Sequence, residues 1–283
     1  MARINELSIL RLLLDAPMTC GWLLHASASF PRPYRSLARI REVMAALHAR
    51  GLVKRVPMLE LHQGQRRWLY YLAPAARRLV PEIADLRPGS GPLAPPADPR
   101  AHALAVAEFV AHLHRAAGEA GERARVLESL RDGALRAEAD LPEAKGKRQR
   151  LVVPDHTFLV EVDGAPQLLL LELQNRGAVI LPASPQSVAR SFRFKLAKHK
   201  AFLAGFREHP LVAQMVAAHG PLPGFRVLVV TTRTESSMRH LLSAAGGYAK
   251  LFYFTTLDRV RAANLILDPI WELPSGAVRA IAD

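Results

Sequence analysis

The stretch Val153-Pro154-Asp155-His156, followed after a Leu-rich run by Leu171-Glu172-Leu173-Gln174, decides the fold of the second half of this chain. Both stretches adjoin apolar runs of strand-like length, and between these runs Asp163-Gly164-Ala165-Pro166 predicts a turn. A four-residue loop at that turn sets Val162 opposite Gln167. The sequence therefore predicts a β-hairpin with both motifs at the same end.

That register brings three polar side chains of the motifs together. It places Asp155 opposite Gln174, while Glu172 lies diagonally across from Asp155 at a Cα distance on the order of 7–8 Å. Carboxylates on adjacent strands can hold Mg2+, which polarises a phosphoryl oxygen and activates a water molecule. Asp155 and Glu172 are therefore the candidate metal ligands, and with Gln174 they form the candidate catalytic site. The alternative is that both carboxylates only mark strand ends.

A Pro-Asp pair before one strand and an acid-x-polar pair closing the next resemble the motifs of the metal-dependent PD-(D/E)XK nuclease fold. The resemblance implies a mixed-sheet domain that binds Mg2+ only if its site is active. Nucleases of this fold usually carry Lys at the position of Gln174, and an amide cannot supply positive charge to the reacting phosphorane. Lys195 or Arg193 is a candidate for the missing cation, and Glu108 is a candidate for a further carboxylate.

The composition favours a polyanionic partner. The 283 residues include 38 Lys and Arg against 25 Asp and Glu, which gives a net charge of +13 and a pI near 10.6. Nucleic acid is the partner that this charge balance predicts. The single Cys20 excludes an intramolecular disulfide and a Cys-based zinc site. Because no apolar run reaches about 18 residues and no signal-peptide core is found, we expect a cytoplasmic protein without a membrane partner.

Residues 85–100 divide the chain, because their Pro-rich and Gly-rich composition predicts a semi-stiff linker. We therefore expect a first domain over residues 1–84 and a second domain over residues 101–283. The first 80 residues hold 13 Lys and Arg but only 4 Asp and Glu, which is a net charge of +9. Most of the excess positive charge thus belongs to the first domain.

The first domain is predicted to contain three helices followed by a basic hairpin. Apolar periodicity favours helices over residues 4–14, 19–25 and 36–50, and strands over residues 52–56 and 68–72. This order resembles winged helix-turn-helix domains of the multiple-antibiotic-resistance regulator type, which implies binding to double-stranded DNA. The candidate DNA contacts are arginines around the third helix and the wing, namely Arg35, Arg39, Arg41, Arg66 and Arg67. The alternative is a protein-interaction module with a solvated basic face.

The second domain is predicted to run helix, three strands, helix, strand, helix, strand. Besides the two arms of the hairpin, the predicted elements are 101–116, 125–131, 187–203, 225–232, 236–245 and 251–256. The fold class is therefore α/β (α+β), with a winged helix-turn-helix followed by a nuclease-like mixed-sheet domain.

The helix expected over residues 187–203 is basic and amphipathic. Its predicted apolar stripe consists of Val188, Phe192, Leu196 and Leu203. From Ser187 to Arg207 all the charged side chains are basic, which suits a phosphate backbone. The candidate DNA contacts of this helix are Arg190, Arg193 and Lys198.

Taken in order, the motifs resemble the replication-relaxation protein family over nearly the whole chain. Besides the hairpin they include Arg-Phe-Lys-Leu at 193–196, Leu-Val-Val-Thr-Thr at 228–232 and Asp-Pro-Ile-Trp at 268–271. The family is associated with plasmids and other mobile elements, which implies a DNA-binding protein whose nuclease-like domain is a second DNA-binding surface. The family usually has Glu-x-Asp at Glu172-Leu173-Gln174, so the loss of the second acid counts against two-metal chemistry.

Two alternatives stay open at this point. One is a Mg2+-dependent DNA endonuclease or nickase, and the other is a winged-helix transcriptional regulator that binds a palindromic site as a homodimer. A relaxase or a replication initiator is the candidate protein partner that the resemblance implies.

Overall fold

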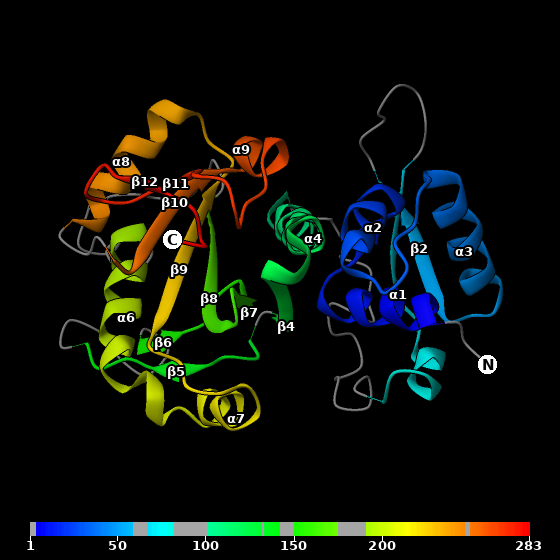
Figure 1. Ribbon diagram of the computed structural model, residues 1–283, viewed down its shortest axis with the longest axis horizontal. Helices are drawn as coiled ribbons and strands as arrows, with labels where there is room; N and C mark the ends of the chain where they lie inside the picture. Colours follow the sequence, from blue (N-terminus) through cyan, green and yellow to red (C-terminus); the bar gives the residue numbers. More distant parts are fainter. Residues whose placement is uncertain are drawn as a thin grey trace. The chain divides into compact units, whose positions relative to one another are not determined.

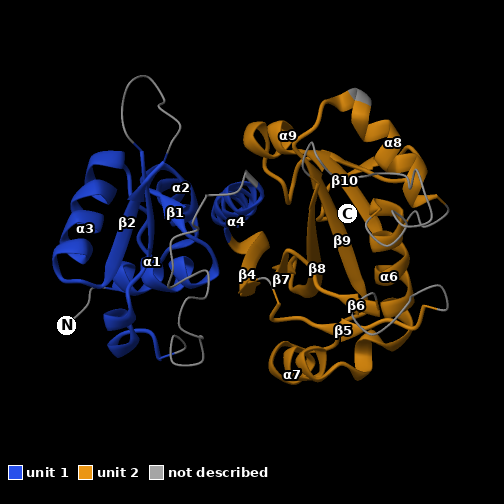
Figure 2. Cartoon of the chain, turned by 180° about the vertical axis from the view of Figure 1, so that it is seen from behind, with its two compact units in different colours: residues 1–121 blue, residues 122–283 orange. Residues whose placement is uncertain are grey.

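The computed structural model describes residues 4–58, 67–81, 101–131, 133–141, 150–174, 191–246 and 250–283. The chain has an α+β fold that divides into two compact units, residues 1–121 and residues 122–283 (Figure 2). The predicted linker, residues 85–100, lies outside the described part of the chain. The first unit has a three-stranded sheet, and the second unit has a seven-stranded sheet and a separate two-stranded sheet, β5-β6, at Ala137–Glu138 and Leu151–Val152.

The first unit contains three helices and a small sheet, followed by one long helix. Its elements are α1 (Ile4–Asp15), β1 (Met18–Thr19), α2 (Cys20–Ala26), η1 (Ser27–Ser29), α3 (Leu37–Ala49), β2 (Val53–Pro57), β3 (Trp68–Leu72), η2 (Pro74–Arg78) and α4 (Ala101–Ala120). The sheet has the order β1-β3-β2, and both strand pairs are antiparallel. The three helices and the hairpin therefore follow the predicted order.

Helix α3 has distinct start and stop signals. The side chain of Ser36 accepts a hydrogen bond from the backbone N–H of Arg39 and caps the N-terminus. The fully buried side chains of α3 are Ile40, Met44 and Leu47. Gly51, with a φ of 68°, ends the helix, and its N–H and that of Leu52 bond back to carbonyls of the last turn. One face is thus anchored in the core and the other is left in solvent.

Helix α4 groups with the first unit, although its residues were expected to open the second domain. The physical reason is a close approach to η1, because a Cβ added to Gly118 would lie 2.2 Å from the backbone carbon of Ala28. His112 of α4 also stacks on His25 of α2, with ring centroids 5.3 Å apart. The Pro-rich residues therefore precede a helix of the same unit.

The second unit is built on a seven-stranded mixed sheet (Figure 1). Its elements are η4 (Gly121–Arg123, at the boundary), β4 (Ala124–Arg131), β5 (Ala137–Glu138), β6 (Leu151–Val152), β7 (His156–Val162), β8 (Ala165–Gln174), α6 (Phe192–Gly205), η6 (Phe206–Glu208), α7 (Pro210–His219), β9 (Phe225–Thr231), α8 (Glu235–Ala245), β10 (Phe252–Thr256), α9 (Leu257–Ala262), β11 (Trp271–Glu272) and β12 (Val278–Arg279). The strand order is β12-β11-β10-β9-β8-β7-β4, with β8, β9 and β10 parallel and the other neighbours antiparallel. Strands β5, β6, β11 and β12, helix α7 and helix α9 were not predicted from the sequence.

The register of the β7–β8 hairpin differs from the predicted one. Val162 pairs with Ala165 and not with Gln167, because Asp163 and Gly164 form a two-residue turn with φ values of 47° and 80°. Positive φ at both central residues is typical of the type I′ turn, whose twist matches that of the flanking strands. The predicted four-residue loop was therefore two residues too long. Because this error shifts the pairing register by two residues, every side chain stays on its predicted face of the sheet.

A hydrophobic core lies between this sheet and the helices α6, α7 and α8. Helices α6 and α8 lie side by side (Figure 1). Its members include Phe192, Leu196, Met215, Met238, Leu170, Val229 and Phe254. The predicted stripe of α6 was wrong at Leu203, which is 41% exposed, and Val188 lies outside the described residues. Because α6 also buries Phe194, His199 and Phe202, no single narrow stripe describes it.

Candidate functional site

The two motif carboxylates lie at the end of the hairpin that is opposite its turn. The pairing of His156 with Leu171 places Asp155, the preceding residue, opposite Glu172. Oδ2 of Asp155 accepts the backbone N–H of Leu173 at 2.7 Å, and the N–H of Asp155 donates to the carbonyl of Leu171 at 2.9 Å. Asp155 therefore continues the strand pairing with its own side chain, beyond the last regular pair of β7.

Glu172 is a buried carboxylate held by two nitrogen donors, and 3% of its side chain is exposed. Nζ of Lys195 lies 2.8 Å from Oε2, and Nε2 of His199 donates to Oε1 at 2.7 Å. Burial alone would raise the pKa of Glu172, but the charge of Lys195 and the hydrogen bond from His199 outweigh it and lower the pKa to about 2. We call Glu172, Lys195 and His199 the carboxylate cluster.

Helix α6 positions both donors of the carboxylate cluster. The side chain of Ser191 caps the helix by accepting a backbone N–H of the first turn at 3.3 Å. Lys195 and His199 are four residues apart and therefore share the helix face that reaches Glu172. Lys198 has a different partner, because its Nζ donates to the carbonyl of Leu151 at 2.7 Å. Burial lowers the pKa of Lys198.

His199 is the member of the cluster that the sequence analysis missed. Its side chain is 2% exposed, and its Nδ1 has no hydrogen-bond partner among the described residues. The available signal was its spacing from Lys195, since side chains four residues apart lie together on a helix. A single His inside a basic run gives no sign of burial, so the pattern alone did not separate it from a solvated residue.

The residues present do not fit a divalent metal ion. Mg2+ requires near-octahedral oxygen ligands, whereas both oxygens of Glu172 meet nitrogen atoms and one oxygen of Asp155 accepts a backbone N–H. The ammonium group of Lys195 would also repel a cation placed beside Glu172. Within the described ranges, no three His, Cys, Asp or Glu side chains are grouped so as to hold a metal. The arrangement instead neutralises a buried carboxylate.

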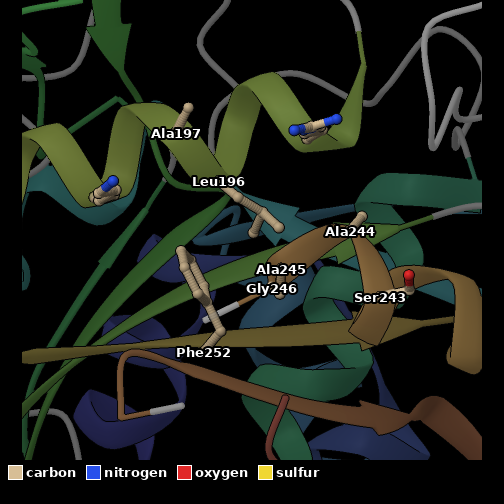
Figure 3. Close-up of a pocket in the computed structure, with 9 residues that line it drawn as sticks. Leu196, Ala197, Ser243, Ala244, Ala245, Gly246 and Phe252 are labelled. Atoms are coloured by element: carbon tan, nitrogen blue, oxygen red, sulfur yellow. The ribbon is translucent and has the colours of Figure 1, made fainter. Parts of the chain in front are cut away.

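The other predicted catalytic residues have different surroundings. Gln174 is buried, and its backbone carbonyl accepts hydrogen bonds from the hydroxyl of Thr231, at the end of β9, and from the backbone N–H of Thr232. Arg193 is exposed and lines a groove between α6 and α8 (Figure 3). Glu108 lies on α4 of the first unit. Its charge acts on His25 of α2, because burial lowers the pKa of His25 and the carboxylate of Glu108 opposes that shift. Arg190 lies outside the described residues.

The first unit carries its predicted DNA-binding arginines on the surface. The exposed arginines at α3 are Arg35, Arg39 and Arg41. Nη1 of Arg39 forms an ion pair with Glu42 at 2.6 Å, and both side chains are more than half exposed. The carboxylate of Glu42 therefore lies beside one of the three guanidinium groups. A phosphate that binds Arg39 would have to displace this carboxylate.

The hairpin of the first unit adds a cation that the sequence analysis missed. The guanidinium carbon of Arg55 on β2 lies 4.3 Å from the centroid of the Trp68 ring on β3. The pairing of the two strands explains this contact. Pro57 pairs with Trp68, and Arg55 lies two residues before Pro57 on the same face of the sheet, diagonally across from Trp68. Of the predicted wing arginines, Arg67 is exposed and Arg66 lies outside the described residues.

The sequence matches the replication-relaxation family over residues 19–194, which is more than half of the chain. The match confirms the family resemblance drawn from the motifs. It covers Asp155 and Glu172 and ends one residue before Lys195. No curated protein and no solved structure matches the chain. In the described part of the chain, no helix has both the length and the apolar character that crossing a membrane requires.

Proposed function

The chain belongs to the replication-relaxation family, and from that premise we propose that it is a DNA-binding protein of a plasmid or another mobile element. In this proposal the first unit is a winged helix-turn-helix that selects the DNA site. The second unit is a nuclease-like domain that supplies another DNA-binding surface. The observation that carries the proposal is the exposed arginine face of α3, opposite its buried stripe.

The geometry of the first unit supports DNA recognition through α3. A recognition helix needs one face fixed in the core and one face free to enter the major groove. Helix α3 has both faces, because Ile40, Met44 and Leu47 are buried while Arg39 and Arg41 are exposed. The neighbouring hairpin is the wing, and Arg67 at its base suits phosphate or the minor groove. The net charge of +9 over the first 80 residues supplies the long-range attraction.

Binding to duplex DNA tests the proposal directly. Fluorescence anisotropy would compare a labelled duplex from the DNA upstream of the coding sequence with an unrelated duplex of equal length, between about 50 mM and about 200 mM salt. We expect tighter binding to the upstream duplex and a steep loss of affinity with salt. Arg41→Ala should weaken both duplexes. A chain that binds neither duplex at the lowest salt would contradict the proposed function.

A metal-dependent endonuclease is the second candidate function, and one contact favours it. Nζ of Lys195 lies 2.8 Å from Glu172 and supplies a positive charge at this site, which the neutral amide of Gln174 cannot supply. Against it stands the poor fit of the carboxylates to a metal ion. The matched test is titration of Mn2+ followed by electron paramagnetic resonance, in the wild type and in Glu172→Gln. An endonuclease would bind Mn2+ in a way that Glu172→Gln abolishes, and we expect no such Glu172-dependent binding.

A further inference from the structure

Strand β2 carries an arginine that is held against one face of the small sheet. Arg55 pairs directly with Tyr70 of β3, and Trp68 lies diagonally across from it. The guanidinium carbon of Arg55 lies 4.3 Å from the centroid of the Trp68 ring. Tyr70 is buried and Trp68 is half-buried, whereas Arg55 is exposed. The two rings therefore form a floor under a cation that faces solvent.

This cation is not neutralised by an acid. In the described part of the chain, the interactions of Arg55 are with aromatic side chains, and none is with a carboxylate. Arg39 of α3 differs, because Glu42 forms an ion pair with it at 2.6 Å. A ring face holds a guanidinium group in place without cancelling its charge. An anion that approaches Arg55 therefore has no carboxylate to displace.

The face that holds Arg55 is continuous with the surroundings of α3. Burial raises the pKa of Tyr70, and a hydrogen bond from Arg55 opposes that shift. Burial also raises the pKa of Cys20, and a hydrogen bond from Tyr70 and the charge of Arg41 oppose it. Arg55 of β2 and Arg41 of α3 therefore act on the same pair of side chains, and these two elements lie side by side (Figure 1).

A stacked arginine suits a phosphate better than a base edge. A guanidinium group that lies over a ring directs its N–H donors outward in its own plane, where they match the oxygens of a phosphate. Reading the minor groove instead requires a side chain that reaches into a slot about 6 Å wide and about 7.5 Å deep. Because Arg55 is held on the sheet by Trp68, it does not extend in this way.

We propose that Arg55 binds a backbone phosphate of the duplex beside the groove that α3 enters, and that Trp68 positions Arg55 for this contact. The inference rests on the proposed DNA-binding function. It adds one binding residue and one positioning residue to the arginines that the sequence predicts. The wing then contributes through the face of its strands, where Arg55 and Trp68 meet.

Fluorescence anisotropy tests the role of Arg55 with the full-length chain, the labelled upstream duplex and an unrelated duplex of equal length. Arg55→Ala should weaken both duplexes by the same factor, about fivefold, because a phosphate carries no sequence information. It should also lower the salt slope by about 0.9, the change for one phosphate contact. Arg55→Lys should keep the slope and lose about twofold in affinity, since an ammonium group lacks the planar fork of arginine.

Lys54→Ala is the matched control. Lys54 is the exposed neighbour of Arg55 and points to the opposite face of β2, so its removal makes the same change in net charge. We expect Kd to change by no more than about twofold, because an exposed charge away from the contact is screened by salt. A loss in Lys54→Ala equal to that in Arg55→Ala would overturn the inference, since binding would then follow net charge alone.

A double-mutant cycle tests the role of Trp68. Trp68→Leu removes the ring but no charge, and we expect it to weaken binding by about threefold in the wild type and not at all in Arg55→Ala. Trp68→Phe keeps an aromatic face under the cation and should retain most of the affinity. Thermal melts separate loss of binding from loss of folding. Equal losses from Trp68→Leu in both backgrounds would overturn the positioning role of Trp68.

The outcomes separate this inference from the proposed function. If Arg55→Ala binds both duplexes as the wild type does, while Arg41→Ala still weakens them, the inference is overturned and the proposed function stands. A loss confined to the upstream duplex would also overturn it, since Arg55 would then read bases and not phosphate. Absence of binding to either duplex at the lowest salt would contradict the proposed function itself.

Discussion

Helices α3 and α6 are both rich in cations, but they place them in different surroundings. On α3 the arginines stand in solvent opposite one buried stripe. On α6 the cations are divided, since Lys195 meets the buried Glu172, Lys198 meets a backbone carbonyl, and Arg193 lines a groove. The difference follows from packing, because α3 buries one face and α6 buries most of its circumference.

This comparison teaches that a run of basic residues does not show how its charges are used. We propose that the exposed cations of α3 attract DNA, whereas part of the charge of α6 is neutralised by Glu172 within the fold. A surface ion pair contributes at most about 1 kcal/mol, but a buried carboxylate that loses its partner is strongly destabilising. The predictions below test whether the cations of the two helices differ in this way.

The largest expected effect comes from removing the charge of Glu172. Glu172→Gln keeps the shape of the side chain but leaves Lys195 without its counter-ion. We expect a loss of about 3 kcal/mol in the free energy of unfolding, at the lower end of the range for buried pairs because Lys195 is 39% exposed. Denaturant unfolding followed by the fluorescence of the buried Trp271, with Trp22 and Trp68 changed to Phe, reports this loss in the second unit.

Asp258→Asn is the control for this change. Asp258 pairs with Arg261 at 2.7 Å, and its side chain is 86% exposed, so its loss should cost no more than about 0.5 kcal/mol. If Glu172→Gln costs as little as Asp258→Asn, the carboxylate cluster does not stabilise the second unit.

Acid should remove the same interaction without a substitution. The folded pKa of Glu172, about 2, lies below its ordinary value of 4.5, so its stabilisation is complete above pH 4.5 and is lost as the pH falls toward 2. The shift corresponds to about 3 kcal/mol at about 1.4 kcal/mol per unit. Unfolding of wild type and Glu172→Gln across this range measures it. Parallel curves for the two proteins would contradict the lowered pKa of Glu172.

Two glycines test whether α4 is an integral part of the first unit. Gly118→Ala would push a methyl group into the backbone of Ala28, and we expect a loss of about 2 kcal/mol. Gly205→Ala on α6 is the matched control, because the nearest atom to its added Cβ is 4.0 Å away, at the end of the Glu208 side chain. Thermal melts measure both. A neutral Gly118→Ala would mean that α4 does not pack against η1.

The smallest expected effect tunes the arginine face of α3. Glu42→Gln removes the carboxylate beside Arg39, so duplex binding should tighten by about threefold, whereas Arg39→Ala should weaken it by about fivefold. Anisotropy at fixed salt measures both, and the salt slope should fall by about 0.9 only in Arg39→Ala. Unchanged affinity in both variants would remove α3 from the DNA interface.

The sequence predicted the order of the main elements and the hairpin, because apolar runs and turn residues report local structure directly. It also placed Asp155 and Glu172 on one face, since an error of two residues in the turn does not change the face of a side chain. The sequence also offers Lys195 as the cation of this site, but it does not reveal His199, because the burial of His199 depends on packing between α6 and β8. The grouping of α4 with the first unit depends on the contact of Gly118 with Ala28, which no local pattern reveals.

We propose that the chain binds DNA without cutting it, because Lys195 pairs with Glu172 in the carboxylate cluster, where a metal ion would otherwise have to bind. The most direct measurement is incubation with supercoiled plasmid carrying the upstream DNA, in Mg2+, in Mn2+ and in EDTA, with nicked and linear products scored beside a gel shift from the same tubes. The account predicts a shift in all three conditions and no nicking. Nicking that requires Mg2+ or Mn2+ and is lost in Asp155→Ala would contradict it and establish an endonuclease.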